Sequence, residues 1–142
     1  MDQKVYTLFM GRRLKKTLRS GYRRIRQRYG LTQLDIELLQ YFEEHPGAMA
    51  TDAICDLDLN KGNVSTALFG LYRNGLIDGR SSDSDQRVVQ YHLKEKGKKI
   101  IRETNEIQDD IMGQLMQGIT KQEETALEGI AAKILANLES MK

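Results

Sequence analysis

The stretch from Asp52 to Gly75 constrains the fold of this chain most, because its apolar residues form two short patterns around a polar break. The first pattern, within residues 52–57, places apolar side chains at Ala53, Ile54 and Leu57. The break, residues 58–62, is polar around one apolar anchor, Leu59. From Asn63 onward the apolar positions have the spacing of a helix that packs one face inward: Val64, Ala67, Leu68 and Leu71. The stretch therefore predicts a helix, a turn and a second helix.

The outward positions of the second helix are small, hydrogen-bonding or cationic near its start, and none is acidic. They are Lys61, Gly62, Asn63, Ser65, Thr66, Phe69, Gly70 and Arg73. A helix that enters the DNA major groove needs short side chains with donors near its N-terminus and no repelling carboxylate. This surface indicates a recognition helix, with DNA contacts from Lys61, Asn63, Ser65, Thr66 and Arg73. The alternative is that Asn60 is only an N-cap and that the polar face is an ordinary solvated one.

Two β-like runs, residues 76–80 and 88–93, follow this helix and are separated by a polar segment. They predict a β-hairpin, and a hairpin directly after a recognition helix is a wing. Arg80 at its base and Arg87 at its tip carry guanidinium groups suited to a narrow minor groove, and Asp85 is placed to hold Arg87. The alternative is a solvated hairpin that carries arginines by chance.

The N-terminal part of the chain predicts two helices. Residues 2–29 read as one long helix that Gly30 ends, with apolar positions at Val5, Leu8, Leu14, Leu18, Tyr22, Ile25 and Tyr29. Thr32 and Asp35 resemble a capping box. They predict the start of a second helix, which ends at residues 45–47, His-Pro-Gly. We expect the inward-facing side chains of this helix to be Leu34, Leu38, Leu39 and Phe42.

The chain from Glu95 to its end reads as two further helices. The first has an apolar stripe at Ile100, Thr104, Ile107, Ile111 and Leu115. The second begins with a capping box, Thr120 to Glu123, and has a stripe at Leu127, Ile130, Ile134, Leu138 and Met141. These stripes, and that of the N-terminal helix, need burial against each other and against a second copy, so we expect a homodimer. Together, these helices and the one hairpin predict a fold of the mainly α (α+β) class.

Charge is distributed unevenly along the chain, although its formal net charge is only +2. Residues 1–30 hold ten Lys or Arg against one Asp, whereas residues 31–46 hold four acids and neither Lys nor Arg. The basic end favours contact with phosphate or another anion. The alternatives are a partly buried helix with a solvated basic face, and a winged-helix module that binds an acidic protein partner.

Few residues offer chemistry other than binding. His45, His92 and Cys55 have no metal-ligand spacing, and the chain has no nucleophile–base pattern or phosphate loop, so we expect no enzyme, metal or cofactor. Acids surround Cys55 in sequence, which favours a buried structural cysteine over the alternative of a redox-switched regulator. A single cysteine and the lack of a long apolar run indicate a cytoplasmic protein that does not enter membranes.

The order of these parts resembles the MarR family of bacterial transcriptional regulators over nearly the whole chain. The matching residues are Leu31-Thr32, Glu43-Glu44-His45-Pro46-Gly47, Asn63-Val64-Ser65, Leu71-Tyr72-Arg73-Asn74-Gly75-Leu76-Ile77, Asp85-Gln86-Arg87, and Leu93 with Gly97. The chain departs from the family pattern at Gly79, at Lys94 and in the helix that begins Asp52-Ala53-Ile54-Cys55.

The resemblance implies a winged helix-turn-helix domain over residues 31–94, flanked by dimerisation segments at residues 1–30 and 95–142. It also implies a homodimer that binds double-stranded DNA at a pseudo-palindromic operator, usually as a repressor. In many members of the family a small-molecule effector releases the DNA.

Overall fold

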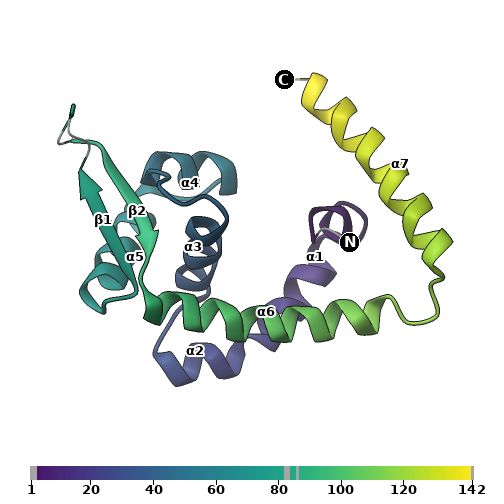
Figure 1. Ribbon diagram of the computed structural model, residues 1–142, viewed down its shortest axis with the longest axis horizontal. Helices are drawn as coiled ribbons and strands as arrows, with labels where there is room; N and C mark the ends of the chain where they lie inside the picture. The colour runs from purple at the N-terminus through teal and green to yellow at the C-terminus, as the bar shows by residue number, and fades with distance from the viewer. Residues whose placement is uncertain (1–2, 82–83, 86, 142) are drawn as a thin grey trace. The chain divides into compact units, whose positions relative to one another are not determined.

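The computed structural model describes residues 3–81, 84–85 and 87–141, and the side chains from residue 8 onward within these ranges (Figure 1). Their elements are α1 (Gln3–Gly21), α2 (Arg23–Tyr29), α3 (Gln33–Glu44), α4 (Ala50–Leu57), α5 (Lys61–Arg73), β1 (Ile77–Ser81), β2 (Val89–Leu93), α6 (Glu95–Leu115) and α7 (Lys121–Ser140). The chain forms two compact units. Tyr22–Glu106 is one, and the chain on either side of it makes up the other.

The prediction of one helix over residues 2–29 is wrong, since two breaks interrupt it. Gly11 has φ 51° and ψ −125°, a conformation outside the helical region that glycine adopts without a Cβ clash. A second break falls at Tyr22, between α1 and α2, and Gly30 then ends α2 in the left-handed conformation, as predicted. Leu14 and Leu18 are buried as expected, whereas the predicted apolar position Val5 lies outside the described side chains.

The helix α3 begins with the predicted capping box. The Thr32 N–H donates to Asp35 Oδ2 at 2.8 Å, and the Asp35 N–H donates to Thr32 Oγ1 at 3.1 Å. Leu38, Leu39 and Phe42 are buried as predicted. Leu34 is only half-buried, and Ile36 takes the inward position in the first turns of the helix.

The helix α4 begins earlier than the sequence predicted, and a side-chain N-cap begins α5. Asp52 Oδ2 accepts the Met49 N–H at 2.8 Å, so α4 begins at Ala50. The helix ends at Leu57, and its C-cap Asp58 has a φ of 52°, a left-handed conformation that Asp tolerates better than most residues. Asn60 Oδ1 accepts the Asn63 N–H at 3.0 Å, and this N-cap, considered in the sequence, starts α5 at Lys61.

The predicted hairpin is present, and β1 pairs with β2 in antiparallel register, with Gly79 opposite Tyr91 and Arg80 opposite Gln90. Ile77 and Leu93, at its base, are buried, and exposure increases along β1 toward Ser81. The hairpin is therefore anchored in the core at one end and solvated at the other. Ser82, Asp83 and Gln86, in the polar segment between the strands, lie outside the described residues.

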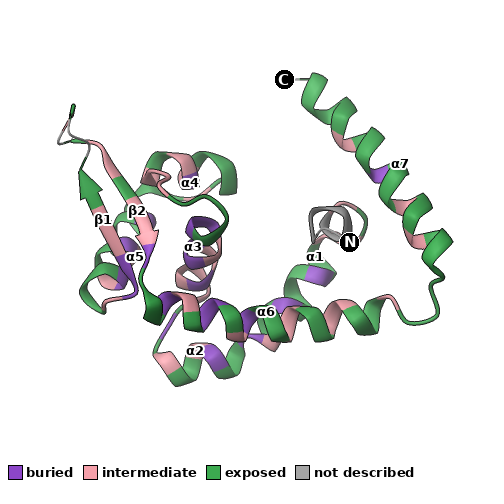
Figure 2. Ribbon diagram, in the orientation of Figure 1, coloured by how far each residue is buried: buried purple, intermediate pink, exposed green. Residues whose placement is uncertain are grey.

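The core of the Tyr22–Glu106 unit is formed where α3, α5 and the base of the hairpin pack together, and the start of α6 also contributes buried residues (Figure 2). Its fully buried side chains include Tyr22, Ile36, Leu38, Leu39, Phe42, Val64, Leu71, Ile77, Ile100 and Thr104. Both α5 and the hairpin are anchored in this core, so it holds their positions relative to each other.

In the other unit, α1 packs against α7. The predicted capping box of α7 is present, with the Glu123 N–H donating to Thr120 Oγ1 at 3.1 Å and the Thr120 N–H donating to Glu123 Oε1 at 3.0 Å. Hydrogen bonding of the Glu123 carboxylate to the Thr120 backbone N–H, and then to the Thr120 side chain, lowers the pKa of Glu123. Only Ala131 of α7 is buried, and most of its predicted apolar stripe is exposed: Ile130, Ile134, Leu138 and Met141 (Figure 2).

Candidate nucleic-acid interface

The helix-turn-helix is held together by burial on its inner side. Ala53 of α4 and Val64 of α5 are fully buried where the two helices pack together. The Tyr41 hydroxyl donates to Asp56 Oδ2 at 2.7 Å, which connects α3 to α4. Burial and this hydrogen bond raise the pKa of Tyr41, so the phenol stays protonated and the bond persists over the physiological range.

The outer surface of α5 presents the predicted recognition residues. Lys61, Asn63, Ser65, Thr66 and Arg73 are all exposed, and none of the thirteen residues of the helix is acidic. The Thr66 hydroxyl donates to Gly62 O at 3.1 Å, which leaves its oxygen free to accept. The surface is thus one of donors, acceptors and two cations.

These residues do not form a single cluster, because two grooves flank α5. One groove, of about 490 Å³, is lined by Asn63 and Thr66 together with the loop that precedes α3. The other, of about 300 Å³, is lined by Ser65 together with hairpin residues such as Val89. Arg73 lies seven residues beyond Thr66, about 10 Å along the helix axis.

The hairpin arginines each have a carboxylate nearby. Arg87 Nε lies 3.3 Å from Asp85 Oδ1, which also accepts the Arg87 N–H at 2.9 Å, so the contact expected from their spacing is present. The Arg87 side chain is nevertheless 93% exposed. Arg80 Nε lies 3.4 Å from Asp78 Oδ2. The expectation that Arg80 lies at the base of the hairpin is wrong, because it is the penultimate residue of β1 and lies toward the tip.

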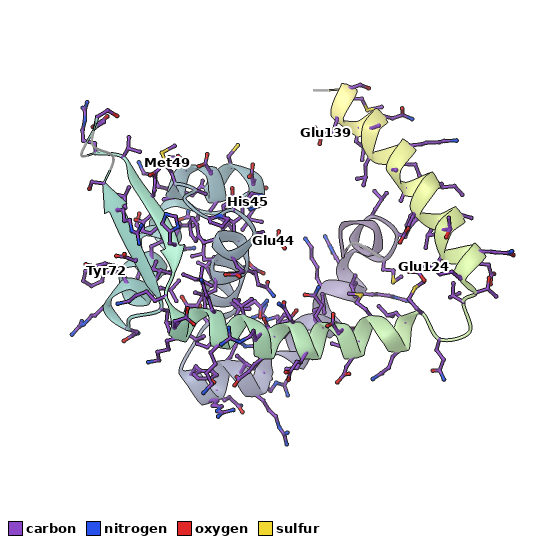
Figure 3. All side chains as sticks on the ribbon, in the orientation of Figure 1. Glu44, His45, Met49, Tyr72, Glu124 and Glu139 are labelled. Atoms are coloured by element: carbon purple, nitrogen blue, oxygen red, sulfur yellow. The ribbon has the colours of Figure 1, made fainter. Side chains whose placement is uncertain are left out.

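The sequence interpretation placed Phe69 on the outward face but did not include it, or Tyr72, among the site residues. Both side chains are exposed, and both line the groove that contains Ser65. Figure 3 labels Tyr72 on α5. The signal was available in the sequence, since Phe69 is four residues after Ser65 and therefore lies on the same side of the helix.

Some basic residues of α2 make hydrogen bonds or ion pairs with other helices of the same unit. Arg26 Nη1 donates to Gln33 Oε1 at 2.9 Å, and Arg28 lies 3.6 Å from Glu103 Oε1. The Tyr29 hydroxyl donates to the same Glu103 oxygen at 2.9 Å. Part of the basic charge of α2 therefore connects it to α3 and α6.

The prediction that Cys55 is buried is wrong, because its side chain is exposed. In α4 it is Ala53 that enters the core, and a residue two positions further on lies about 200° around the helix. Among the described residues, no group of three or more His, Cys, Asp or Glu side chains is placed to hold a metal ion. None of the helices described combines the length and apolar character needed to cross a bilayer.

No family model matches the chain. Over 100 residues the chain is 29% identical to the transcriptional repressor MprA of Escherichia coli strain K12, a match that covers 70% of this chain. The match spans 57% of the length of MprA.

Solved structures match over more of the chain. A MarR-family transcriptional regulator from Silicibacter pomeroyi has a TM-score of 0.76 at 23% identity, covering 93% of this chain and 89% of that one. FabT of Streptococcus pneumoniae in complex with DNA has a TM-score of 0.73 at 20% identity, covering 99% of this chain and 100% of that one. The MepR–DNA complex of S. aureus has a TM-score of 0.62 at 20% identity, covering 92% and 98%. The chain therefore has the winged helix-turn-helix fold of the MarR-family regulators, as its sequence predicted.

Proposed function

We propose that this protein is a sequence-specific DNA-binding transcriptional regulator, acting as a repressor, that binds a pseudo-palindromic operator as a homodimer. The observation that carries the proposal is the pairing of an exposed, acid-free α5 with a hairpin whose Arg87 side chain is 93% exposed. A helix of this surface suits the major groove, and an exposed guanidinium suits the narrow minor groove beside it. The fold relatives FabT and MepR, which were solved with DNA, and the repressor MprA support this function.

The site residues take distinct roles in this proposal. Base edges are contacted by Asn63, Ser65 and Thr66, because these residues have short polar side chains in the first turns of α5. Lys61 and Arg73, at the two ends of the helix, contact backbone phosphates. Arg80 and Arg87 reach the minor groove, and Asp85 restrains Arg87 through its 3.3 Å contact. The DNA-binding domain is residues 31–94.

Dimerisation belongs to the flanking segments, residues 1–30 and 95–142. The exposed apolar residues of α7 and its C-cap are three or four positions apart, so they lie on one side of the helix: Ile130, Ile134, Leu138 and Met141. An exposed apolar stripe of this kind marks an interaction surface. Because operators of two-fold symmetry are bound by symmetric dimers, a second copy of this chain is the natural partner. Its DNA target places the regulator in the bacterial cytoplasm.

The first test is binding of the full chain to duplex DNA. A salt-dependent mobility shift on random duplex DNA, and selection of a recurrent palindrome from a random pool, are expected. Absence of any shift at low salt would favour the protein-interaction module instead. The small-molecule effector that the family resemblance implies stays a prediction, and a ligand screen for operator release would test it.

Replacing Arg87 with alanine is expected to lower operator affinity about tenfold and to reduce the slope of log K against log salt by about one. The reason is the loss of a highly exposed cation at the solvated end of the hairpin. Fluorescence anisotropy at four or more salt concentrations measures both quantities. Lys133→Ala is the control, because Lys133 is an exposed cation on α7, outside the proposed DNA-binding domain. Unchanged affinity and slope in Arg87→Ala would remove the hairpin from the interface.

A further inference from the structure

Phe69 and Tyr72, two aromatic side chains on α5, are exposed to solvent rather than buried in the core of the Tyr22–Glu106 unit. Of the large apolar residues described in Tyr22–Glu106, only Leu57, Phe69 and Tyr72 are exposed. Phe69 is 66% exposed and Tyr72 is 57% exposed, compared with 39% for Leu57. Aromatic side chains contribute strongly to burial when they find a surface to pack on, so their exposure together marks a contact site.

The position of the pair associates it with the proposed reading face of α5. Ser65, Phe69 and Tyr72 line the same groove, whose other wall includes Gly79, Val89 and Tyr91 of the hairpin. Leu68 also lines this groove but is itself buried, and the core residue Leu71 is about 160° from Phe69 around the helix. Phe69 therefore extends the surface that begins with Ser65 toward the C-terminal half of the helix.

The charges around this surface favour a polyanion as its occupant. Lys61 and Arg73 flank the aromatic pair on α5, and Arg80 lies on the neighbouring strand. The helix carries no carboxylate, and the nearby Asp78 is already paired with Arg80. Duplex DNA supplies both the negative charge and, on its major-groove edges, one apolar group, the C5 methyl of thymine.

We propose that Phe69 contacts a thymine C5 methyl in the major groove and so specifies a T·A pair in each half of the operator. This inference rests on the proposed function and names one determinant of its specificity. Phe69 is four positions beyond Ser65, about 6 Å along the helix axis, so we expect the two side chains to face different base pairs. An aromatic ring reads the methyl by contact alone and needs no hydrogen bond.

The test replaces each thymine of a selected operator half-site, one at a time, with deoxyuridine, which removes only the methyl. The full-length wild-type protein is expected to lose about fourfold in affinity at one thymine per half-site, the effect of one buried methyl group. Phe69→Ala is expected to bind thymine and uracil equally at that position. Phe69→Leu, which keeps an apolar side chain, is expected to retain part of the preference.

Tyr72→Ala is the matched control, because it removes the neighbouring exposed aromatic and is expected to keep the wild-type ratio of thymine to uracil affinity. An unchanged melting temperature checks that Phe69→Ala folds, as expected for an exposed residue. The proposal is overturned if the wild type distinguishes thymine from uracil at no position, or if Phe69→Ala keeps the wild-type ratio. Failure of the wild type to bind any duplex would instead reject the proposed function on which the inference rests.

Discussion

Replacing both Ile134 and Leu138 with glutamate is expected to separate the proposed homodimer and to lower operator affinity by about 100-fold. Ile134 is 36% exposed and Leu138 is 47% exposed, and the two lie one turn apart on α7. Two carboxylates on each copy would repel across a two-fold interface and would need desolvation there. Each monomer would then bind one half-site without the effective concentration that the second half-site gains from the first.

Sedimentation velocity measures the change in assembly, and anisotropy on the same operator measures the affinity. Ala132→Glu with Ala136→Glu is the matched control, because these residues are also exposed and one turn apart but lie on another side of α7. The control is expected to remain dimeric with wild-type affinity. A double mutant at Ile134 and Leu138 that still sediments as a dimer would place the interface elsewhere.

Local signals in the sequence predicted the helix boundaries that local hydrogen bonds determine. Thr32 with Asp35 and Thr120 with Glu123 form the capping boxes that their spacing indicated. Gly30 ends α2 in a left-handed conformation. Each of these features involves groups at most four residues apart, so the sequence alone carries the information.

The errors concern features that depend on longer-range packing or on one backbone angle. The periodicity of residues 2–29 continues across Gly11, but its φ of 51° interrupts the helix there. The acids around Cys55 in the sequence suggested a buried structural cysteine, whereas the orientation of α4 against α5 brings Ala53 to the core and leaves Cys55 exposed. In a short helix a small rotation decides which residue is buried, and its own sequence does not determine that rotation.

The candidate site was predictable by residue type but not by arrangement. The pattern identified an exposed polar face on α5 and a carboxylate beside Arg87. It did not show that the face is divided between two grooves, with Asn63 in one and Ser65 in the other. That division depends on where the hairpin and the loop before α3 pack. The position of Phe69 beside the hairpin depends on the same packing.

A glycine at the start of α6 connects the family motif to the fold. Gly97 is buried, and a Cβ at this position would collide with the Leu76 carbonyl oxygen and lie 3.4 Å from Leu93 Cγ. The same carbonyl accepts the Lys94 N–H at 2.9 Å, a bond that holds the exit of the hairpin against its entry. The sequence showed Gly97 only as part of a motif, and the structure supplies the reason that no larger residue fits.

Gly97→Ala is expected to lower the free energy of unfolding by about 2–3 kcal/mol, because the Leu76 backbone cannot move without disturbing the buried base of the hairpin. Chemical denaturation followed by circular dichroism measures the loss. Gly113→Ala is the matched control: it lies in the same helix, is exposed, and a Cβ there meets nothing within 4 Å. The better helix propensity of alanine should make that variant more stable by up to about 1 kcal/mol. The opposite signs separate the packing effect from propensity, and equal gains at both positions would show that Gly97 is not closely packed.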